Sequence, residues 1–293
     1  MARFRVFLVA SAAMLVGVLF ATGLAAASMR SMLHVPRTVR PDVLGSEVVQ
    51  MRAADQALLK ASWLAPTPGS DRCVLFLHGS GGWRQRGAQF TPLLREEKYG
   101  LLAPDSRAHG ESGGDKVTFG ILEKYDALGW VKWMQAHGCQ KIYGLGESLG
   151  SSVLILTAEI EPVFTAIVAD CPFADLFEAA EVRIIRRLPL PDKVAGAFAA
   201  MAVEGDSLFA RVFYGLDFSA VKPVESIKHV NTPILLIHGT ADSRTPFTDS
   251  QALAAAKPDT TELWLVPGAE HLRSFATDPQ EYSRKVVAWV QEH

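Results

Sequence analysis

The sequence predicts an α/β fold, with a mostly parallel central sheet, helices on both faces and a small helical cap insert. From residue 73 onward, short apolar runs typical of buried strands alternate with helical segments, the pattern of a parallel sheet covered on both faces. Only residues 172–231 interrupt this alternation, with mixed helical signals, several prolines and no clear strand, which predicts the cap. Because a single insert breaks the pattern, we expect one domain over residues 47–293 rather than two smaller domains.

The expected elements follow in chain order. Residues 47–53 and 57–65 predict an antiparallel hairpin, which a proline-rich turn at residues 66–69 closes. The later strands, each short and largely apolar, are residues 73–78, 100–107, 141–146, 165–170, 233–239 and 262–268. The expected helices are residues 86–98, 122–138, 148–160, 247–257 and 279–292.

Composition excludes several classes of protein. The 293 residues include 29 Lys and Arg against 31 Asp and Glu, and 49% of them are hydrophobic, which excludes a disordered or fibrous chain. A formal net charge of -2 gives no basic surface for DNA or RNA, so we expect no nucleic-acid partner. The three cysteines, Cys73, Cys139 and Cys171, allow at most one disulfide.

The N-terminus explains part of the slightly positive mean hydropathy of +0.15. Residues 6–27 carry no charge and follow Arg3 and Arg5, so residues 1–27 are expected to be a transmembrane anchor or a signal peptide. Cleavage of a signal peptide would fall before Ser28. Residues 28–46 are expected to be a linker. The chain is therefore expected to be membrane-anchored with its catalytic domain outside the cytoplasm, or secreted or periplasmic if the segment is cleaved.

The most specific motif is GESLG at residues 146–150, a G-x-S-x-G between a predicted strand and a predicted helix. A nucleophile on a tight, strained turn needs neighbours without a Cβ atom, so the glycines and the position both point to Ser148 as a catalytic nucleophile. The alternative is an ordinary small-residue turn that joins a strand to a helix.

A serine nucleophile needs a base and an acid that orients the base. His271 follows one predicted strand and Asp242 follows the one before it, and catalytic groups collect at the carboxyl ends of parallel strands. We therefore expect His271 to be the base and Asp242 the acid. Asp170, which also ends a strand, is the alternative acid. The competing interpretations are a surface-loop histidine for His271 and a turn or helix-capping residue for Asp242.

A glycine-rich turn, HGSGG at residues 78–82, follows the first buried strand. Backbone N–H groups on such a turn can stabilise the oxyanion of acyl transfer. We expect the N–H groups of Leu149 and Ser80 to form the oxyanion hole, with Gly81 as second choice for Ser80, and His78 to be a structural hydrogen-bonding residue. A flexible glycine turn is the alternative.

Motifs for cofactors and metals do not occur. The glycines at 144, 146 and 150 do not form G-x-G-x-x-G, and no G-K-[ST] phosphate loop or H-E-x-x-H zinc motif follows elsewhere. We expect no cofactor and no metal.

Five motifs together resemble the α/β-hydrolase superfamily: HGSGG, DSRAHGESGG at residues 105–114, GESLG, HGTAD at 238–242 and GAEH at 268–271. The chain looks like the serine-hydrolase branch with serine aminopeptidase-like and prolyl-oligopeptidase-like proteins, several of which begin with one membrane-spanning helix. The similarity covers about residues 44–292. It implies the α/β-hydrolase fold and the triad of Ser148, Asp242 and His271.

The resemblance also implies that residues 105–114 support the nucleophile. Within them we expect Asp105 to pair with Arg107 and His109 to form local hydrogen bonds. Glu147, beside the nucleophile, is expected to be a structural acceptor, and the alternative is that it contacts the substrate.

The sequence therefore predicts a serine hydrolase that cleaves carboxylic esters of small molecules through an acyl-enzyme. An amidase, peptidase or thioesterase with the same triad, and a non-catalytic binding module, are the alternatives. Aromatic residues of the insert either wall an acyl pocket or simply pack the cap on the sheet; among them are Phe173, Phe177, Phe198, Phe209, Phe213 and Tyr214.

Overall fold

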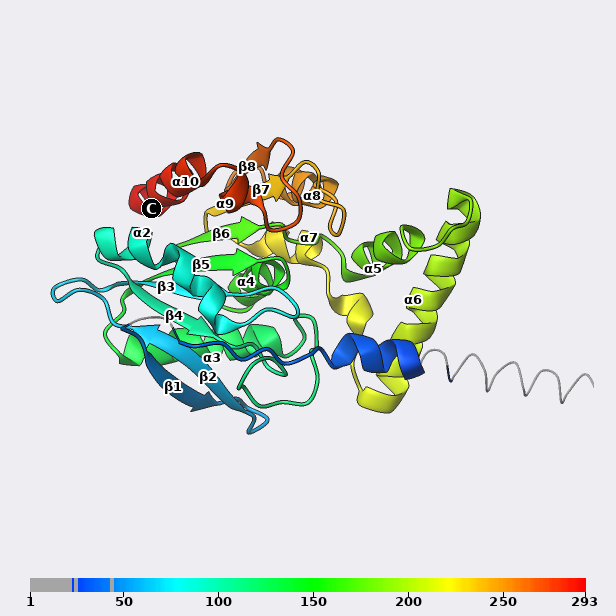
Figure 1. Ribbon diagram of the computed structural model, residues 1–293, viewed down its shortest axis with the longest axis horizontal. Helices are drawn as coiled ribbons and strands as arrows, with labels where there is room; N and C mark the ends of the chain where they lie inside the picture. Colours follow the sequence, from blue (N-terminus) through cyan, green and yellow to red (C-terminus); the bar gives the residue numbers. More distant parts are fainter. Residues whose placement is uncertain (1–22, 24–25, 43–44) are drawn as a thin grey trace, which may run out of the picture.

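The computed structural model describes residue 23, residues 26–42 and residues 45–293. In this part of the chain an eight-stranded sheet has the order β1-β2-β4-β3-β5-β6-β7-β8 (Figure 1). Strand β2 runs antiparallel to β1 and β4, and all other neighbours pair in parallel. The strands are β1 (Glu47–Arg52), β2 (Leu58–Leu64), β3 (Arg72–Leu77), β4 (Gly100–Pro104), β5 (Lys141–Glu147), β6 (Ala166–Asp170), β7 (Ile234–Gly239) and β8 (Thr261–Val266). The predicted hairpin, strand set and α/β-hydrolase fold are confirmed.

Helices cover both faces of the sheet because its inner strands are apolar on both sides. In β3, Leu75 belongs to one hydrophobic core and Phe76 to the other, as the alternation of side chains along a strand requires. The first core includes α3 (Glu123–Ala136), α4 (Leu149–Ile160) and α8 (Thr248–Ala256), and the second includes α2 (Thr91–Glu96) and α10 (Pro279–Glu292), with the short α9 (Ser274–Thr277) beside it.

The helix expected at residues 86–98 is divided. Residues Arg84–Phe90 form the 3-10 helix η1, and α2 begins at Thr91. Pro92 lies in the first turn of α2, and proline has no N–H with which to continue a helix from the preceding turn.

The predicted insert is helical and lies at one end of the molecule, away from α10 (Figure 1). It contains α5 (Leu176–Ile185), α6 (Asp192–Tyr214), η2 (Phe218–Ala220), α7 (Pro223–Ser226) and η3 (Ile227–His229). The side chain of Asp175 caps the start of α5, and Gly215 ends α6 in the left-handed conformation that favours glycine. Small residues on the inner face of α6, Ala195 and Ala199, are fully buried.

Residues 26–33 form a helix, although residues 28–46 are expected to be a linker. Met29 and Leu33 are fully buried in the first core, and Ser28 Oγ donates a hydrogen bond of 2.6 Å to Asp206 Oδ2 of α6. Residues 1–22, 24 and 25 of the expected anchor or signal peptide lie outside the described residues. Among the helices that the structure describes, none is both long and apolar enough to cross a bilayer.

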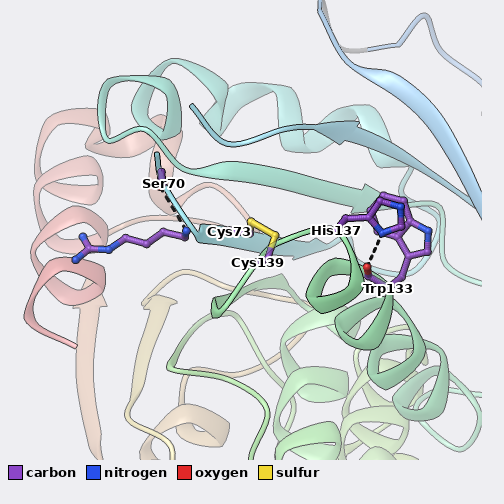
Figure 2. The surroundings of a disulfide bond; sticks show 6 residues. Ser70, Cys73, Trp133, His137 and Cys139 are labelled. Carbon is purple, nitrogen blue, oxygen red and sulfur yellow. Dashed lines mark hydrogen bonds between the residues drawn. A yellow bond between two sulfur atoms is a disulfide. The ribbon is translucent and has the colours of Figure 1, made fainter. Parts of the chain in front are cut away.

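One disulfide joins Cys73, in β3, to Cys139, just after α3, across 66 residues of sequence (Figure 2). The bond fastens the first buried strand to the end of the helix that covers it. Cys171 is buried and free.

Candidate active site

Ser148 lies on the turn between β5 and α4, in a strained backbone conformation with φ of 52° and ψ of -112°. A Cβ atom on Gly150 would lie 2.1 Å from the carbonyl oxygen of Leu77, and one on Gly146 would lie 2.5 Å from the backbone nitrogen of Ser151. Only glycine fits at either position. The turn therefore holds the hydroxyl of Ser148 in place, as the G-x-S-x-G pattern predicts.

The structure brings the three residues of the predicted triad together. His271 Nε2 lies 3.1 Å from Ser148 Oγ, and His271 Nδ1 lies 2.6 Å from Asp242 Oδ2. Asp242 follows β7 and His271 follows β8, so both extend from the carboxyl edge of the sheet, where β5 also ends. These distances suit a base that takes a proton from serine while an acid orients its ring.

Asp242 is held as a carboxylate. Burial alone would raise its pKa, but hydrogen bonds from His238 and His271 outweigh burial and hold the pKa of Asp242 well below its ordinary value. The backbone N–H groups of Arg244 and Thr245 donate to its other oxygen, at 2.8 Å and 2.9 Å. The carboxylate is thus charged and fixed beside the imidazole.

Asp170, the alternative acid, has a different environment. Its Oδ1 accepts hydrogen bonds from Ser274 Oγ and from the thiol of Cys171, and no hydrogen bond joins its carboxyl group to His271 in the described chain. Burial raises the pKa of Asp170 to about 6. The geometry therefore favours Asp242 as the partner of His271.

The two predicted oxyanion donors are placed beside the nucleophile. Ser80, Ser148 and Leu149 line one cavity. Within the described chain, the backbone N–H groups of Ser80 and Leu149 have no acceptor. The N–H of Gly81, by contrast, donates to His109 Nε2 at 2.9 Å. Ser80 therefore remains available for an oxyanion, whereas Gly81 does not.

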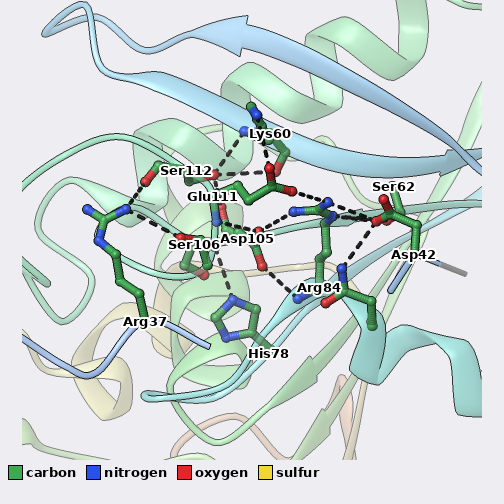
Figure 3. Close-up of polar contacts among 12 residues, drawn as sticks. Arg37, Asp42, Lys60, Ser62, His78, Arg84, Asp105, Ser106, Glu111 and Ser112 are labelled. Atoms are coloured by element: carbon green, nitrogen blue, oxygen red, sulfur yellow. Dashed lines mark hydrogen bonds and ion pairs between the residues drawn. The ribbon is translucent and has the colours of Figure 1, made fainter. Parts of the chain in front are cut away.

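The predicted ion pair between Asp105 and Arg107 is wrong. Arg107 pairs with Asp126 and Asp55, whereas Asp105 pairs with the fully buried Arg84 at 2.6 Å (Figure 3). Both arginines are buried and each bonds to more than one carboxylate, so the loop at residues 105–114 is tied on two sides. The loop is structural support, as expected, but through partners that lie far away in sequence.

Two buried histidines link this loop to the glycine-rich turn. His78 Nε2 accepts a hydrogen bond of 3.0 Å from the N–H of Ser106 (Figure 3). His109 forms the bond to Gly81 described above. Burial, together with the nearby His109, lowers the pKa of His78 to about 3, and burial also lowers the pKa of His109. Both rings are therefore neutral near pH 7 and position the turn that carries Ser80, as the predicted structural roles of His78 and His109 require.

Glu147 is a structural acceptor. Its carboxylate binds the guanidinium of Arg86 and accepts a hydrogen bond of 2.9 Å from Gln89 Nε2. Neither Arg86 nor Gln89 can be identified as a partner from the sequence, because both lie in η1, about sixty residues away in the chain. With these partners, Glu147 is fully engaged.

The cavity beside Ser148 has a volume of about 450 Å³ and is mostly apolar. Of the aromatic residues in the insert, Phe173, Phe177 and Phe218 line it, whereas Phe198, Phe213 and Tyr214 are exposed. Other residues in the wall of the cavity cannot be identified from the sequence, because their positions depend on how the N-terminal helix and the cap pack. These residues include Met29, Met32, Val35, Arg183, Arg187 and Val203.

One group of possible metal ligands lies in the described part of the chain. Atoms of Cys171, His238 and Asp242 lie within 4.8 Å of one another. However, burial raises the pKa of Cys171 well above its ordinary value, and metals bind the thiolate. The ring nitrogens of His238 already contact Ser250 Oγ at 2.7 Å and the carbonyl of Thr245 at 3.0 Å. We therefore assign no metal to this group.

Comparison with known proteins gives one family. The model of the "Alpha/beta hydrolase family" matches residues 74–285. The uncharacterized protein YqkD of Bacillus subtilis is 25% identical over 238 residues, which cover 79% of this chain and 75% of that protein. The lysophosphatidylserine lipase ABHD12 of Macaca fascicularis is 26% identical over 195 residues, 61% of this chain and 43% of that protein. The esterase Pf2001 of Pyrococcus furiosus has a similar structure, with a TM-score of 0.72 and 24% identity over 88% of this chain and 98% of that one.

Proposed function

This chain belongs to the alpha/beta hydrolase family, and from that premise we propose that it is a serine esterase. The observation that carries the proposal is the unbroken series of hydrogen bonds from Ser148 through His271 to Asp242. Such a series is the arrangement that activates a serine hydroxyl for attack on a carbonyl.

The proposed reaction has two halves. His271 Nε2 takes the proton of Ser148 as the hydroxyl attacks the ester carbonyl, and Asp242 stabilises the imidazolium that forms. The N–H groups of Ser80 and Leu149 hold the oxyanion of the tetrahedral intermediate. His271 then returns the proton to the leaving alcohol. Water hydrolyses the acyl-enzyme by the same steps, and no cofactor or metal takes part.

The proposed substrate is an amphiphilic ester with an apolar acyl chain. Phe173, Phe177 and Met32 line the cavity beside Ser148 and suit an acyl chain. Arg183 and Arg187 also line it, and neither forms an ion pair within the described chain, so they suit an anionic group on the substrate. The similarity to a lysophosphatidylserine lipase supports the same substrate class.

We also propose that the catalytic domain works outside the cytoplasm, held by its N-terminal segment or released after cleavage. The disulfide between Cys73 and Cys139 supports this location, because structural disulfides persist in oxidising compartments.

Labelling with a fluorophosphonate probe tests the proposal on the unchanged chain and on three variants. The variants are Ser148→Ala, Asp242→Asn and Asp170→Asn. We expect Ser148→Ala to abolish labelling and hydrolysis of p-nitrophenyl butyrate. Asp242→Asn should lower kcat by about 10⁴-fold, because the imidazole loses its orienting carboxylate. Asp170→Asn is the matched control and should change kcat by less than about tenfold.

Labelling that persists in folded Ser148→Ala would refute the nucleophile, and equal losses in the two aspartate variants would refute the acid. A series of p-nitrophenyl esters with increasing chain length, compared with the p-nitroanilides of the same acids, tests the substrate class. We expect kcat/KM to rise with chain length for the esters and the anilides to be poor substrates.

A further inference from the structure

Helix α6 presents an exposed apolar face to solvent. We call this face the apolar stripe; its side chains occur four, three, four, three and four residues apart, which places them on one side of an α-helix. The stripe consists of Val194, Phe198, Met201, Gly205, Leu208 and Val212. Its five side chains beyond glycine are between 50% and 72% exposed. Soluble proteins rarely leave such a row of large apolar side chains without a partner.

From this face we infer that α6 lies in the interface of a lipid bilayer, with the apolar stripe against the acyl chains. The helix has 23 residues but carries charged side chains along its length, including Lys193, Glu204 and Arg211 on one flank of the stripe. A helix with a charged side and an apolar side lies along a membrane surface rather than across it.

The sequence that precedes the helix at residues 26–33 favours a membrane beside the stripe. Residues 6–22 contain no charged residue, and they come shortly before that helix in the sequence. That helix is fixed to α6 by the bond from Ser28 to Asp206 (dark blue and yellow-green in Figure 1). A charge-free segment of this kind is expected to enter a bilayer. The folded domain would therefore meet the bilayer at α6.

A charge next to the stripe fits the same surface. Arg186 precedes α6, is exposed and forms no ion pair within the part of the chain that the structure describes. Leu190, between it and the stripe, is 44% exposed. Basic residues beside exposed apolar ones suit lipid phosphates above acyl chains.

The location has a consequence for the substrate, which rests on the proposed function. Val203 and Asp206, on the inner side of α6, line the same cavity as Ser148. An amphiphilic ester could pass from the bilayer around α6 into this cavity without its acyl chain crossing water. The substrate class inferred here is therefore a membrane-embedded amphiphilic ester.

The first experiment measures contact with lipid and does not depend on activity. The full chain is reconstituted in phosphatidylcholine vesicles, with a nitrobenzoxadiazole label on Met201→Cys in the stripe or on Tyr125→Cys, an exposed position of α3. Doxyl-labelled phosphatidylcholine should quench most of the fluorescence at position 201 and little at position 125. Equal, weak quenching at both positions would overturn the inference. It would also be overturned if the label at position 201 became protected from quenching only as the protein-to-lipid ratio rises, because a second copy of the chain would then cover the stripe.

The second experiment measures access to substrate. The variant Phe198→Glu, Met201→Glu, Leu208→Glu keeps the N-terminal segment and changes no residue of the cavity. It should hydrolyse soluble p-nitrophenyl acetate at the unchanged rate, but a long-chain ester in phosphatidylcholine vesicles about tenfold more slowly. The matched control, Val48→Glu, Tyr125→Glu, Ile160→Glu, adds the same charge at exposed apolar positions of β1, α3 and α4, and should slow neither reaction.

Equal vesicle rates in the two triple variants would refute a role for the stripe. If the unchanged enzyme does not hydrolyse the soluble ester, the proposed function is refuted. The quenching experiment then decides the inference about the membrane by itself.

Discussion

Two buried aspartates lie near the carboxyl edge of the sheet. Near pH 5 the carboxyl group of Asp242 is ionised, whereas that of Asp170 is mostly protonated. Asp242 accepts bonds from two histidines and two backbone N–H groups, so its pKa falls. Asp170 is fully enclosed, and burial raises its pKa to about 6. Asp249 also has a pKa raised by burial to about 6. The same residue type thus serves as a fixed charge in one place and as a protonated hydrogen-bonding group in another.

This difference predicts how stability depends on pH. In the unfolded chain Asp170 has a pKa near its ordinary value of 3.8, whereas in the folded chain it is about 6. The folded state binds the proton more tightly, so the stability from this group is fully present below about pH 4 and is lost as pH rises through 6, by about 3 kcal/mol. Asp242 has the opposite sign and loses its contribution only below about pH 4.

Asp170→Asn should therefore flatten the decline in unfolding free energy between pH 4 and pH 7. Urea unfolding at a series of pH values measures the slope, and Asp249→Asn should flatten it in the same window. An exposed-site control, Asp259→Asn, should leave the slope as it is. An Asp170→Asn protein that is as pH-dependent as the unchanged chain would show that burial does not raise this pKa.

Individual residues differ in how far the sequence predicts them. Ser148 could be found because the glycines that its turn requires are its immediate neighbours in the chain. The partners of Asp105 and Glu147 could not, because Arg84 and Arg86 lie in another element and reach these carboxylates only after the chain folds. Local motifs point to the proposed reacting groups, whereas tertiary packing decides which charges pair.

At the scale of elements, the disulfide closes a large covalent loop that contains part of the sheet. It joins β3 to the end of α3 and encloses the segment that contains α2, β4 and residues 105–114. Both sulfur atoms are buried, since Cys73 and Cys139 are at most 1% exposed. Restricting the unfolded chain across 66 residues should stabilise the fold by about 4 kcal/mol.

Replacing both cysteines, Cys73→Ala and Cys139→Ala, should therefore lower the unfolding free energy by about 4 kcal/mol. Urea unfolding measures the loss. Dithiothreitol should lower the stability of the unchanged chain toward that of the double variant and leave the variant unaffected. If the reductant changes both proteins equally, the bond between Cys73 and Cys139 is not the cause.

The strands follow from the sequence more directly than the helices do. The inner parallel strands are largely apolar runs, and burial on both faces requires such a run whatever its neighbours are. The helix at residues 26–33 has no sustained periodicity that would identify it. Its stability comes from contacts with α6 and the first core, which a local pattern does not contain.

At the scale of the whole molecule, the N-terminal helix joins the cap to the hydrolase core. The alternation of strands and helices predicts the main domain, but the boundary expected at residue 47 leaves out residues that the structure packs into it. Met29 and Leu33 are fully buried, and Met29, Met32 and Val35 line the cavity beside Ser148. Residues before the first strand thus contribute both to stability and to the wall of the cavity beside Ser148.

Two deletions separate these contributions from those of the preceding apolar segment. A chain without residues 1–22 keeps every contact that the structure describes for the helix at residues 26–33, so it should unfold at the same urea concentration as the full chain and hydrolyse soluble p-nitrophenyl butyrate equally well. A chain without residues 1–33 loses two fully buried side chains, each worth about 2–5 kcal/mol, and one wall of the cavity. It should be less stable and show a higher KM.

The point variant Leu33→Ala should lose about 2–5 kcal/mol of unfolding free energy with the preceding apolar segment intact. If removing residues 1–33 costs no more stability than removing residues 1–22, the helix is not part of the folded domain.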